Sequence, residues 1–269
     1  MPSLPVPEPA IVRTLRAAGC VFAEEEARLL TQAAHTPRQL AAMLRRRASG
    51  VPLEHILGWV EFCGLRIAVD AGVFVPRRRT EFLVRQAARL LEPSDGARPA
   101  PVVVDLCCGS GAVGAALASL AGPLELHAAD VDPAAVACAR RNVLPLGGEV
   151  HEGDLFAPIP ARLRGAVLVL AVNAPYVPSA AIGTMPPEAR LHEPRASLDG
   201  GADGLDVQRR VAAAAPQWLA PGGRLLIETS RGQAPRTAEL FRRSGLTARV
   251  LHSGKLDATV VAGGIRRSG

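Results

Sequence analysis

From residue 101 onward, short apolar runs alternate with helical patterns of apolar residues. The predicted strands are 102–106, 124–130, 149–154, 167–173 and 224–229, and the predicted helices are 112–121, 133–143 and 204–220. Two further apolar runs, 247–252 and 258–263, lie close enough in sequence to form a hairpin. Short apolar strands separated by helices are typical of a parallel sheet covered on both faces. We therefore predict a doubly wound, Rossmann-like α/β fold with an antiparallel C-terminal end.

The first 91 residues have a different pattern. Apolar residues recur at helical spacing between residues 8 and 49, with Thr36-Pro37 as a helix start and Gly50 as a stop. The segment EFCGLRIAV then alternates apolar and polar residues and contains a glycine turn, which predicts a β-hairpin. A further helix is predicted from Thr80 to a Pro/Gly-rich loop at 92–101. The expected parts are an N-terminal helical domain (1–58), a β-hairpin linker (59–79) and an α/β domain (80–269).

Composition narrows the class of protein. The 269 residues are 48% hydrophobic but only 3% aromatic, so the core is predicted to be aliphatic. No apolar stretch approaches the roughly 18 residues of a membrane-spanning helix. The first ten residues lack both a basic leader and an apolar signal core. These features lead us to expect a soluble cytoplasmic protein.

The net charge of +6 and the pI of about 9.7 raise the question of a nucleic-acid partner. Only Lys255 is a lysine among the 31 basic residues, so the arginine excess is typical of a compositional bias of the source genome. The triplets Arg45–Arg47 and Arg77–Arg79 could meet phosphates or an acidic partner. We interpret the first triplet as solvated surface.

Cysteines and histidines give no sign of a metal site. The five cysteines are odd in number and no pair has CxxC spacing, so we expect reduced thiols without disulfides or zinc. The six histidines are scattered and are not predicted to form a ligand cluster. Cys108 is predicted to be a small core residue, because no His or acid is placed by the sequence to activate it.

A glycine-rich loop follows the first strand of the α/β domain. In VVVDLCCGSGAVG, the glycines Gly109, Gly111 and Gly114 match the GxGxxG fingerprint of nucleotide-binding βα units. Asp105 precedes the glycines, and Asp130 ends the next strand, where a carboxylate can accept both ribose hydroxyls. The pyrophosphate of NAD would be repelled by Asp105, whereas the sulfonium and ammonium groups of S-adenosylmethionine (SAM) would be attracted. We therefore predict SAM as the cofactor.

Other polar residues lie at the same predicted sheet edge. Asp154 ends the third strand and is predicted to accept a hydrogen bond from the adenine amino group, with Leu155 as apolar cover for the ring. Because ligands of open α/β sheets bind at the carboxyl ends of the strands, we expect these residues to share one site.

The fourth strand ends in the sequence AVNAPYVP, residues 171–178. The amide oxygen of Asn173 and the backbone oxygen of Ala174 can each accept one N–H of a planar NH2 group. Pro175 disfavours the helical region for Ala174, which presents that carbonyl, and Tyr176 can stack on the planar group. Holding both hydrogens aims the nitrogen and stabilises its positive transition state. We therefore predict a site for N-methylation of an amide or a nucleobase amine.

These motifs together resemble the HemK/PrmC protein-(glutamine-N5) methyltransferases over roughly residues 50 to 265. The family signature Asn-Pro-Pro-Tyr stands as NAPY at 173–176, and the loop Asp-Leu-Gly-x-Gly-x-Gly stands as DLCCGSG at 105–111. The Pro-Arg-Pro-x-Thr-Glu segment stands as PRRRTE at 76–81, and a Glu-Pro segment stands as EPRASLDGGADGL at 193–205. This protein differs at Ala174, Cys107, Arg78 and Arg79, and in a shorter helical N-terminus.

The resemblance implies a class I SAM-dependent methyltransferase that modifies the glutamine of the Gly-Gly-Gln loop in peptide release factors. It places the target amide at residues 173–176 and gives the N-terminal helices a role in docking the release factor. It places the cofactor on these residues: Cys107, Cys108, Gly109, Ser110, Gly111, Asp130, Leu155 and Asn173. Glu81 and Glu193 are candidates for shaping the mouth of the site, and Trp59 and Trp218 are predicted packing residues.

Three alternatives remain open at the level of sequence. Similar Asn-Pro-Pro-Tyr turns serve methylation of exocyclic amines in RNA or DNA, with the flipped base stacked on the aromatic residue. A small-molecule amide is another target that the same chemistry allows. Ala174 and Cys107 also leave room for a binding module that keeps the fold without turnover.

Overall fold

The structure is a computed structural model that describes residues 8–91 and 100–265. The prediction that the chain lacks a leader concerns residues 1–7, which lie outside the described residues. Most of the predicted Pro/Gly-rich loop falls on residues 92–99, which also lie outside them. A seven-stranded sheet runs in the order β5-β4-β3-β6-β7-β9-β8. Its strands are β3 (Val102–Leu106), β4 (Glu125–Asp130), β5 (Glu149–Glu152), β6 (Val167–Val172), β7 (Leu219–Thr229), β8 (Arg249–Ser253) and β9 (Ala258–Gly263). The first five are parallel and the last two form an antiparallel hairpin, which confirms the predicted fold class.

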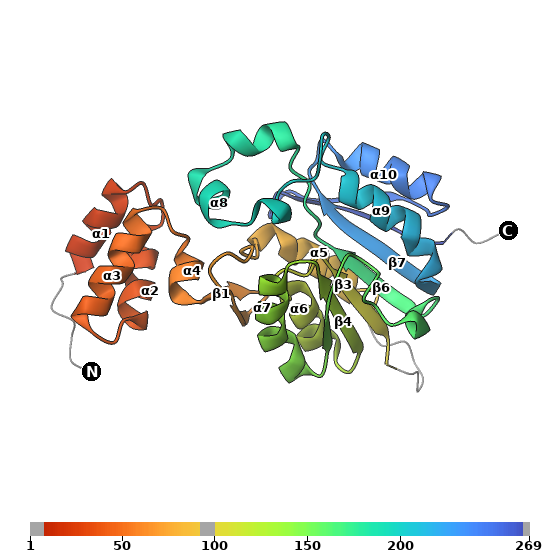
Figure 1. The fold of residues 1–269 in the computed structure, drawn as a ribbon, viewed down its shortest axis with the longest axis horizontal. Coiled ribbons are helices and arrows are strands. Elements are labelled where there is room, and N and C mark those ends of the chain that lie inside the picture. The colour runs from red at the N-terminus through yellow and green to blue at the C-terminus, as the bar shows by residue number, and fades with distance from the viewer. Residues whose placement is uncertain (1–7, 92–99, 266–269) are drawn as a thin grey trace.

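Helices cover both faces of this sheet (Figure 1). They are α5 (Glu81–Ala88), α6 (Ala112–Ala121), α7 (Pro133–Val143), α9 (Asp206–Ala214) and α10 (Ala234–Arg243), whereas the short helix α8 (Pro187–His192) lies away from the sheet. Helices α5 to α7 pack with Val103, Ala128 and Val169 on one face, and α9 and α10 pack with Val104, Leu170 and Ile227 on the other. Because β3 and β6 are buried on both faces, their sequences are almost wholly apolar.

The N-terminal helices form a separate small core. Helices α1 (Glu8–Ala17), α2 (Ala23–Ala33) and α3 (Pro37–Ala48) bury Leu15, Leu30 and Leu40, and they lie to one side of the sheet (Figure 1). The predicted start of α3 is confirmed, because the Thr36 hydroxyl accepts a hydrogen bond from the Gln39 N–H at 3.1 Å. Helix α4 (Leu53–Leu57) then leads to the hairpin of β1 (Trp59–Phe62) and β2 (Leu65–Ala68).

The hairpin is fastened to the α/β domain by one amide that the sequence did not single out. Asn142 in α7 accepts the Ala68 N–H at 2.9 Å and donates to the Ala68 C=O at 2.9 Å and to the Ser110 C=O at 2.8 Å. Asn142 thereby joins the hairpin to the glycine-rich loop. The linker is consequently part of the wall around that loop rather than a free connection.

Two expectations about elements were wrong. The helix predicted at 204–220 ends at Ala214, because Pro216 lacks the N–H that an α-helix needs, and a short 3₁₀ turn follows. Strand β7 then begins at Leu219, five residues before its predicted start. Helices α8 and α10 were not predicted, and α8 lies in the long segment between β6 and α9 above the linker (Figure 1).

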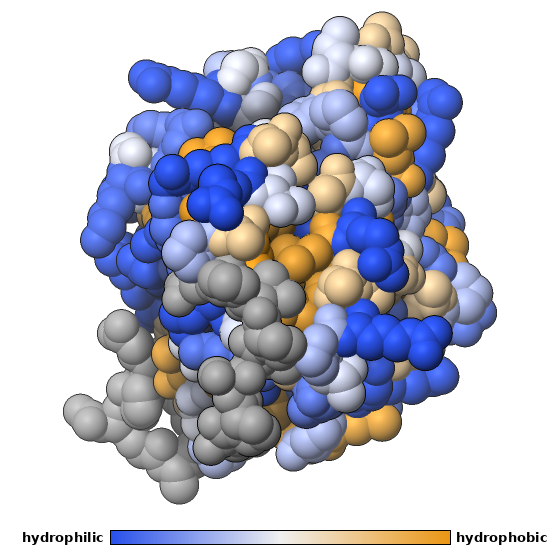
Figure 2. Space-filling model, turned by 90° about the vertical axis from the view of Figure 1, so that its left-hand side faces the viewer, coloured by the Kyte–Doolittle hydropathy of each residue, from blue (hydrophilic) through white to orange (hydrophobic). Residues whose placement is uncertain are grey.

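The surface on the side of the N-terminal helices is largely hydrophilic, with smaller apolar areas between the charged residues (Figure 2). The interpretation of Arg45–Arg47 as solvated surface was wrong for Arg47. Its side chain is only 11% exposed and pairs with Glu26 in α2 and Glu188 in α8. Among the described residues, no helix is both long and apolar enough to span a membrane.

Candidate active site

One pocket lies at the carboxyl ends of β3, β4 and β6 and beside the residues that follow β5. Every residue predicted to bind the cofactor or the target lines it except Gly111: Asp105, Cys107, Cys108, Gly109, Ser110, Asp130, Asp154, Leu155, Asn173, Ala174, Pro175 and Tyr176. Gly111 instead allows α6 and α7 to pack closely, since a Cβ there would lie 2.8 Å from the Val143 side chain. The parallel pairing of β3 with β6 brings residues 105 and 173 to the same edge of the sheet.

Asp105 is buried at the base of this pocket, with 1% of its surface exposed. Its Oδ2 accepts the Gly114 N–H at 2.8 Å, which satisfies a donor in the first turn of α6. Burial is the main cause that raises the pKa of Asp105 to about 7, and the Gly114 hydrogen bond acts in the opposite direction. The residue therefore both anchors the helix and holds a titratable group against the pocket.

Asp130 links the ends of β3 and β4. Its two carboxylate oxygens accept the Gly109 N–H at 2.8 Å and the Asp132 N–H at 3.0 Å. Burial raises the pKa of Asp130, and these backbone donors partly offset the rise. Each oxygen keeps a second lone pair that can accept a hydroxyl, which is the requirement for ribose binding.

The two cysteines of the loop differ in backbone conformation. Cys107 has φ +56°, in the left-handed region that favours glycine, so the glycine usual in the resembling family has a direct physical reason. The structure accommodates the Cβ of Cys107, but the left-handed backbone conformation is unfavourable for a residue other than glycine. Burial is the main cause that raises the pKa of both the Cys107 and Cys108 thiols. The two thiols therefore stay protonated and are poor nucleophiles, in agreement with the prediction for Cys108.

Asp154 and Leu155 lie at the rim of the pocket. Asp154 forms an ion pair with Arg210 in α9, and both side chains are 56% exposed. Arg210 also lines the pocket, and no sequence signal predicts this pairing because the two residues are far apart along the chain. Leu155 has φ +49°, so the backbone turns sharply there and directs a large apolar side chain to the same wall.

Asn173 lines the pocket together with Asp105 and Asp130, as the amide hypothesis requires. Its Nδ2 lies on the side of Thr80, 3.5 Å from Oγ1, which is a long contact for a hydrogen bond. In this orientation Oδ1 is the atom that can accept an N–H of an amino group in the pocket. Ala174 is 2% exposed, so the position that replaces the family's first proline is tightly packed.

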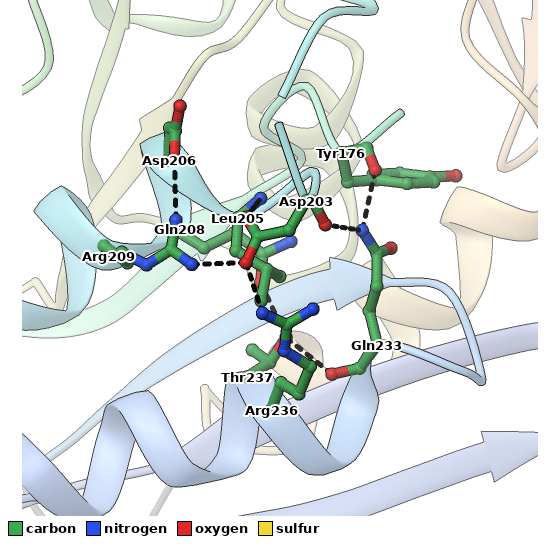
Figure 3. Close-up of polar contacts among 9 residues, drawn as sticks. All are labelled: Tyr176, Asp203, Leu205, Asp206, Gln208, Arg209, Gln233, Arg236 and Thr237. Atoms are coloured by element: carbon green, nitrogen blue, oxygen red, sulfur yellow. Dashed lines mark hydrogen bonds and ion pairs between the residues drawn. The ribbon is translucent and has the colours of Figure 1, made fainter. Parts of the chain in front are cut away.

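The end of the NAPY turn is held by a side chain that the sequence did not single out. Gln233, just before α10, donates from Nε2 to the Tyr176 C=O at 2.9 Å and to the Asp203 C=O at 3.1 Å (Figure 3). Its Oε1 accepts the Ser230 hydroxyl at 2.7 Å. Gly204 makes room for this contact, because a Cβ there would lie 2.3 Å from both the Gln233 Nε2 and the Tyr176 O.

Two buried acids that support the pocket face arginines of the PRRRTE segment. Glu193 is 6% exposed, and it accepts the Val75 N–H at 3.2 Å and pairs with Arg77 at 2.5 Å. Glu228 at the end of β7 is 2% exposed and lies 3.5 Å from the Arg79 Nε. Burial raises the pKa of both carboxyls, whereas the arginines act in the opposite direction.

Arg79 in turn lies over the ring of Tyr176, 6.0 Å from its centroid. Burial raises the pKa of Tyr176 to about 12, so its phenol is neutral near pH 7. Arg79 and Tyr176 therefore form one side of the pocket, and the buried Glu228 lies behind them in contact with Arg79. Glu81, a candidate for shaping the mouth of the site, pairs with Arg85 in its own helix. Trp218, a predicted packing residue, is buried and stacks on Phe156.

The protein is similar to known methyltransferases. Residues 65–176 match the family model described as Methyltransferase small domain. The release factor glutamine methyltransferase of Geobacter sulfurreducens is 40% identical over 214 residues, which are 78% of this chain and 72% of the relative. The protein of the same name from Mycolicibacterium smegmatis is 36% identical over 255 residues, 88% of each chain. The 4-amino-L-phenylalanine/4-methylamino-L-phenylalanine methyltransferase of Streptomyces pristinaespiralis is 36% identical over 75% of this chain and 69% of its own.

Solved structures support the same fold. A methyltransferase from Pyrococcus furiosus has a TM-score of 0.52 at 15% identity and covers 74% of this chain and 88% of its own. The ribosomal protein L11 methylase of Lactobacillus delbrueckii subsp. bulgaricus has a TM-score of 0.51 at 14% identity, covering 75% and 86%. The resemblance inferred from the motifs is thus confirmed by relatives that match most of the sequence. The protein belongs to the family of release factor glutamine methyltransferases.

Proposed function

We propose that the protein is a SAM-dependent N-methyltransferase that modifies the side-chain amide of a protein glutamine, in the Gly-Gly-Gln loop of a peptide chain release factor. The observation that carries this proposal is that Asn173 lines one pocket with Asp105 and Asp130. A neutral NH2 group needs a hydrogen-bond acceptor, which the amide of Asn173 provides. A cationic methyl donor is attracted by negative charge, which Asp105 and Asp130 provide.

The residues present fit SAM. Asp105 and Asp130 supply negative charge, the glycine-rich loop supplies backbone groups, and the buried Ser110 Oγ has no hydrogen-bond partner within residues 8–91 and 100–265. In this assignment Asp130 holds the ribose, Asp154 and Leu155 hold the adenine, and Cys107 to Ser110 line the loop. When bound, SAM would supply an electrophilic methyl group, with S-adenosyl-L-homocysteine as the product that leaves.

The protein's own contribution is to position the target nitrogen. Asn173 Oδ1 and the Ala174 C=O each accept one N–H of the glutamine amide, which fixes the direction of the nitrogen lone pair. Tyr176 covers the planar group, and Arg79 lies over the same aromatic ring. A general base is not needed before transfer, since the proton becomes acidic once the nitrogen is methylated. Positioning and carbonyl dipoles therefore supply most of the rate acceleration in this proposal.

Mass spectrometry of release factors incubated with the enzyme and SAM tests the proposal. The expected result is the gain of one methyl group on the peptide that contains the Gly-Gly-Gln sequence. The Asn173→Ala variant is the matched control and should bind SAM but transfer at least ~100-fold more slowly. An unmodified glutamine peptide after incubation with an enzyme that binds SAM would reject the release factor as substrate.

A second candidate is a small aromatic amine. It is favoured by one observation, the 36% identity to a relative named for 4-amino-L-phenylalanine. An arylamine is also a planar NH2 group, so the same two carbonyl acceptors serve it. Transfer of labelled methyl groups to 4-amino-L-phenylalanine, measured beside release factors and total RNA or DNA, separates the candidates. Label that nuclease removes would instead favour the nucleobase alternative.

A further inference from the structure

A cluster of histidines and glutamates lies outside the pocket, on the outer two strands of the sheet. His127 in β4 pairs in register with Glu149 in β5, and His151 is two residues further along β5. Because alternate residues of a strand face the same side, all three side chains lie on one face. The expectation that the histidines are scattered was therefore wrong for His127 and His151, whose rings stack with centroids 5.2 Å apart.

The three ligand atoms have the separations of a metal site. His127 Nδ1 lies 3.0 Å from His151 Nε2, a contact that is a hydrogen bond between the two rings without a metal, and each of these nitrogens lies 3.8 Å from Glu149 Oε2. A point equidistant from the three atoms is about 2.1 Å from each, within the usual range for zinc bound to histidine nitrogen or carboxylate oxygen. Two imidazoles and one carboxylate from adjacent strands are also a ligand set typical of zinc.

Glu125 is placed to orient the ring of His127 through a hydrogen bond. Its Oε1 lies 3.0 Å from His127 Nε2, the ring nitrogen that faces away from the cluster. Since a carboxylate only accepts, this contact places the proton of His127 on Nε2 and leaves the Nδ1 lone pair directed to the cluster. A histidine that ligates a metal usually donates its second N–H to a carboxylate in this way.

The charged neighbour Arg162 does not occupy the ligand position. It pairs with Glu125, and its Nη2 lies 3.9 Å from Glu149 Oε1, the oxygen that is not shared with the histidines. The exposure of the cluster is graded: the His127 side chain is fully buried, that of His151 is 16% exposed and that of Glu149 is 57% exposed. One side is therefore open to water, which can supply a fourth ligand.

We propose that His127, His151 and Glu149 bind a divalent transition-metal ion, with Zn²⁺ the best match in size and ligand type. The ion joins edge strand β5 to β4. Three residues beyond His151, the same segment reaches the pocket at Asp154. The role we assign to the metal is to hold this edge strand in place, so it stabilises the fold and does not act on the methylated nitrogen.

Titration of chelator-treated, full-length protein with ZnCl2 tests the site without reference to enzymatic activity. Calorimetry should detect one equivalent of Zn²⁺ and a rise of the unfolding temperature with added metal. The variants His151→Gln and Glu149→Gln change partly exposed side chains and should weaken binding at least ~10-fold. Glu152→Gln on the same strand and His252→Gln on β8 are matched controls and should bind as the wild type does.

Cobalt substitution identifies the ligand type, because the free cysteines are competing ligands. Co²⁺ bound by the proposed nitrogen and oxygen atoms gives d–d bands without the near-ultraviolet charge-transfer band of a thiolate complex. A thiolate band, equal binding by Glu149→Gln and wild type, or the absence of one-equivalent binding by the wild type would each overturn the proposal. None of these outcomes bears on methyl transfer, so the two proposals fail separately.

Discussion

At the scale of single residues, Asp105 gives the pocket a pH dependence. Its pKa is raised by burial to about 7, well above the ordinary value of 3.8, so the carboxyl is partly protonated near neutrality. A cationic ligand binds the ionised form better, and the fraction of that form increases as the pH rises through 7. We therefore expect the affinity for SAM, measured by calorimetry, to increase between pH 6 and pH 8.

The variant Asp105→Asn serves as the control for this prediction. Its amide oxygen can still accept the Gly114 N–H, but the charge is gone. Affinity for SAM should fall by about tenfold at pH 8, equivalent to roughly 1.4 kcal/mol, and the rise between pH 6 and pH 8 should be lost. A wild-type affinity that decreases with pH over this range would contradict the assigned role, because the sign of the linkage would be reversed.

Cys107 provides a second prediction at this scale. A left-handed backbone costs a non-glycine residue about 1–2 kcal/mol, whereas glycine loses about 0.5–1 kcal/mol through the entropy of the unfolded state. Cys107→Gly should therefore raise the free energy of unfolding by up to about 1 kcal/mol in urea titrations. Cys107→Val, with a β-branched side chain at φ +56°, should lower it.

Cys63 supplies the matched control, since it also has a positive φ, of 51°, in the turn between β1 and β2. Cys63→Gly should change the free energy of unfolding by a similar amount and leave SAM binding unaltered. A Cys107→Val protein as stable as Cys107→Gly would show that the loop does not hold this residue in the left-handed region.

At the scale of elements, the strand that carries the NAPY turn depends on a clamp from a distant segment. Gln233 donates to the Tyr176 C=O through an Nε2 that a glutamate does not have (Figure 3). Gln233→Glu should release the end of the turn and place an acceptor against that carbonyl. Because a displacement of about 1 Å at a reacting group can cost 10²-fold in rate, kcat should fall by about 10- to 100-fold.

Affinity for SAM separates this effect from general unfolding, since Gln233 lies outside the residues that line the pocket. The affinity for SAM should change less than about twofold in Gln233→Glu. A conservative change at Arg236, whose side chain pairs with Asp203, should leave kcat nearly unaltered. Loss of SAM binding in parallel with kcat would show that Gln233 supports the whole fold rather than the turn.

The elements also show how far the sequence could predict the structure. All seven strands of the large sheet were located from the sequence. The apolar signal is strongest in β3 and β6, which are buried on both faces, and weak in the outer strands β5 and β8, which have exposed and partly exposed residues. Pro216 was overlooked as a helix stop, so α9 was predicted too long. The contacts of Gln233, Arg210 and Asn142 join residues tens of positions apart, and neither periodicity nor motif spacing encodes such contacts.

At the scale of the whole molecule, one buried arginine joins three segments. Arg47 in α3 pairs with Glu26 in α2 at 2.6 Å and with Glu188 in α8 at 3.1 Å. Helix α8 belongs to the segment that also supplies Met185, Pro194 and Leu198 to the pocket wall. The N-terminal helices are thereby connected to the active-site wall through a charge contact, in addition to the continuous backbone of the linker.

The two ion pairs of Arg47 differ in burial and should differ in energy. Glu26 is 10% exposed in its side chain and Glu188 is 43% exposed, so the first pair is desolvated and the second is screened by water. Arg47→Met should lower the free energy of unfolding by about 3 kcal/mol, because it leaves Glu26 as a buried, uncompensated charge. Glu188→Gln should cost only about 0.5 kcal/mol.

Urea unfolding followed by circular dichroism measures these differences, and the double variant Glu26→Gln with Arg47→Met isolates the cause. Removing both buried charges should restore more than half of the stability lost in Arg47→Met, since the penalty arises from the unpaired carboxylate and not from the missing contact. Glu188→Gln should instead act locally and increase amide hydrogen exchange in α8 while the exchange of α2 and α3 stays unchanged. An Arg47→Met protein no less stable than Glu188→Gln would place the connection between the helices and the pocket wall in apolar packing rather than in this ion pair.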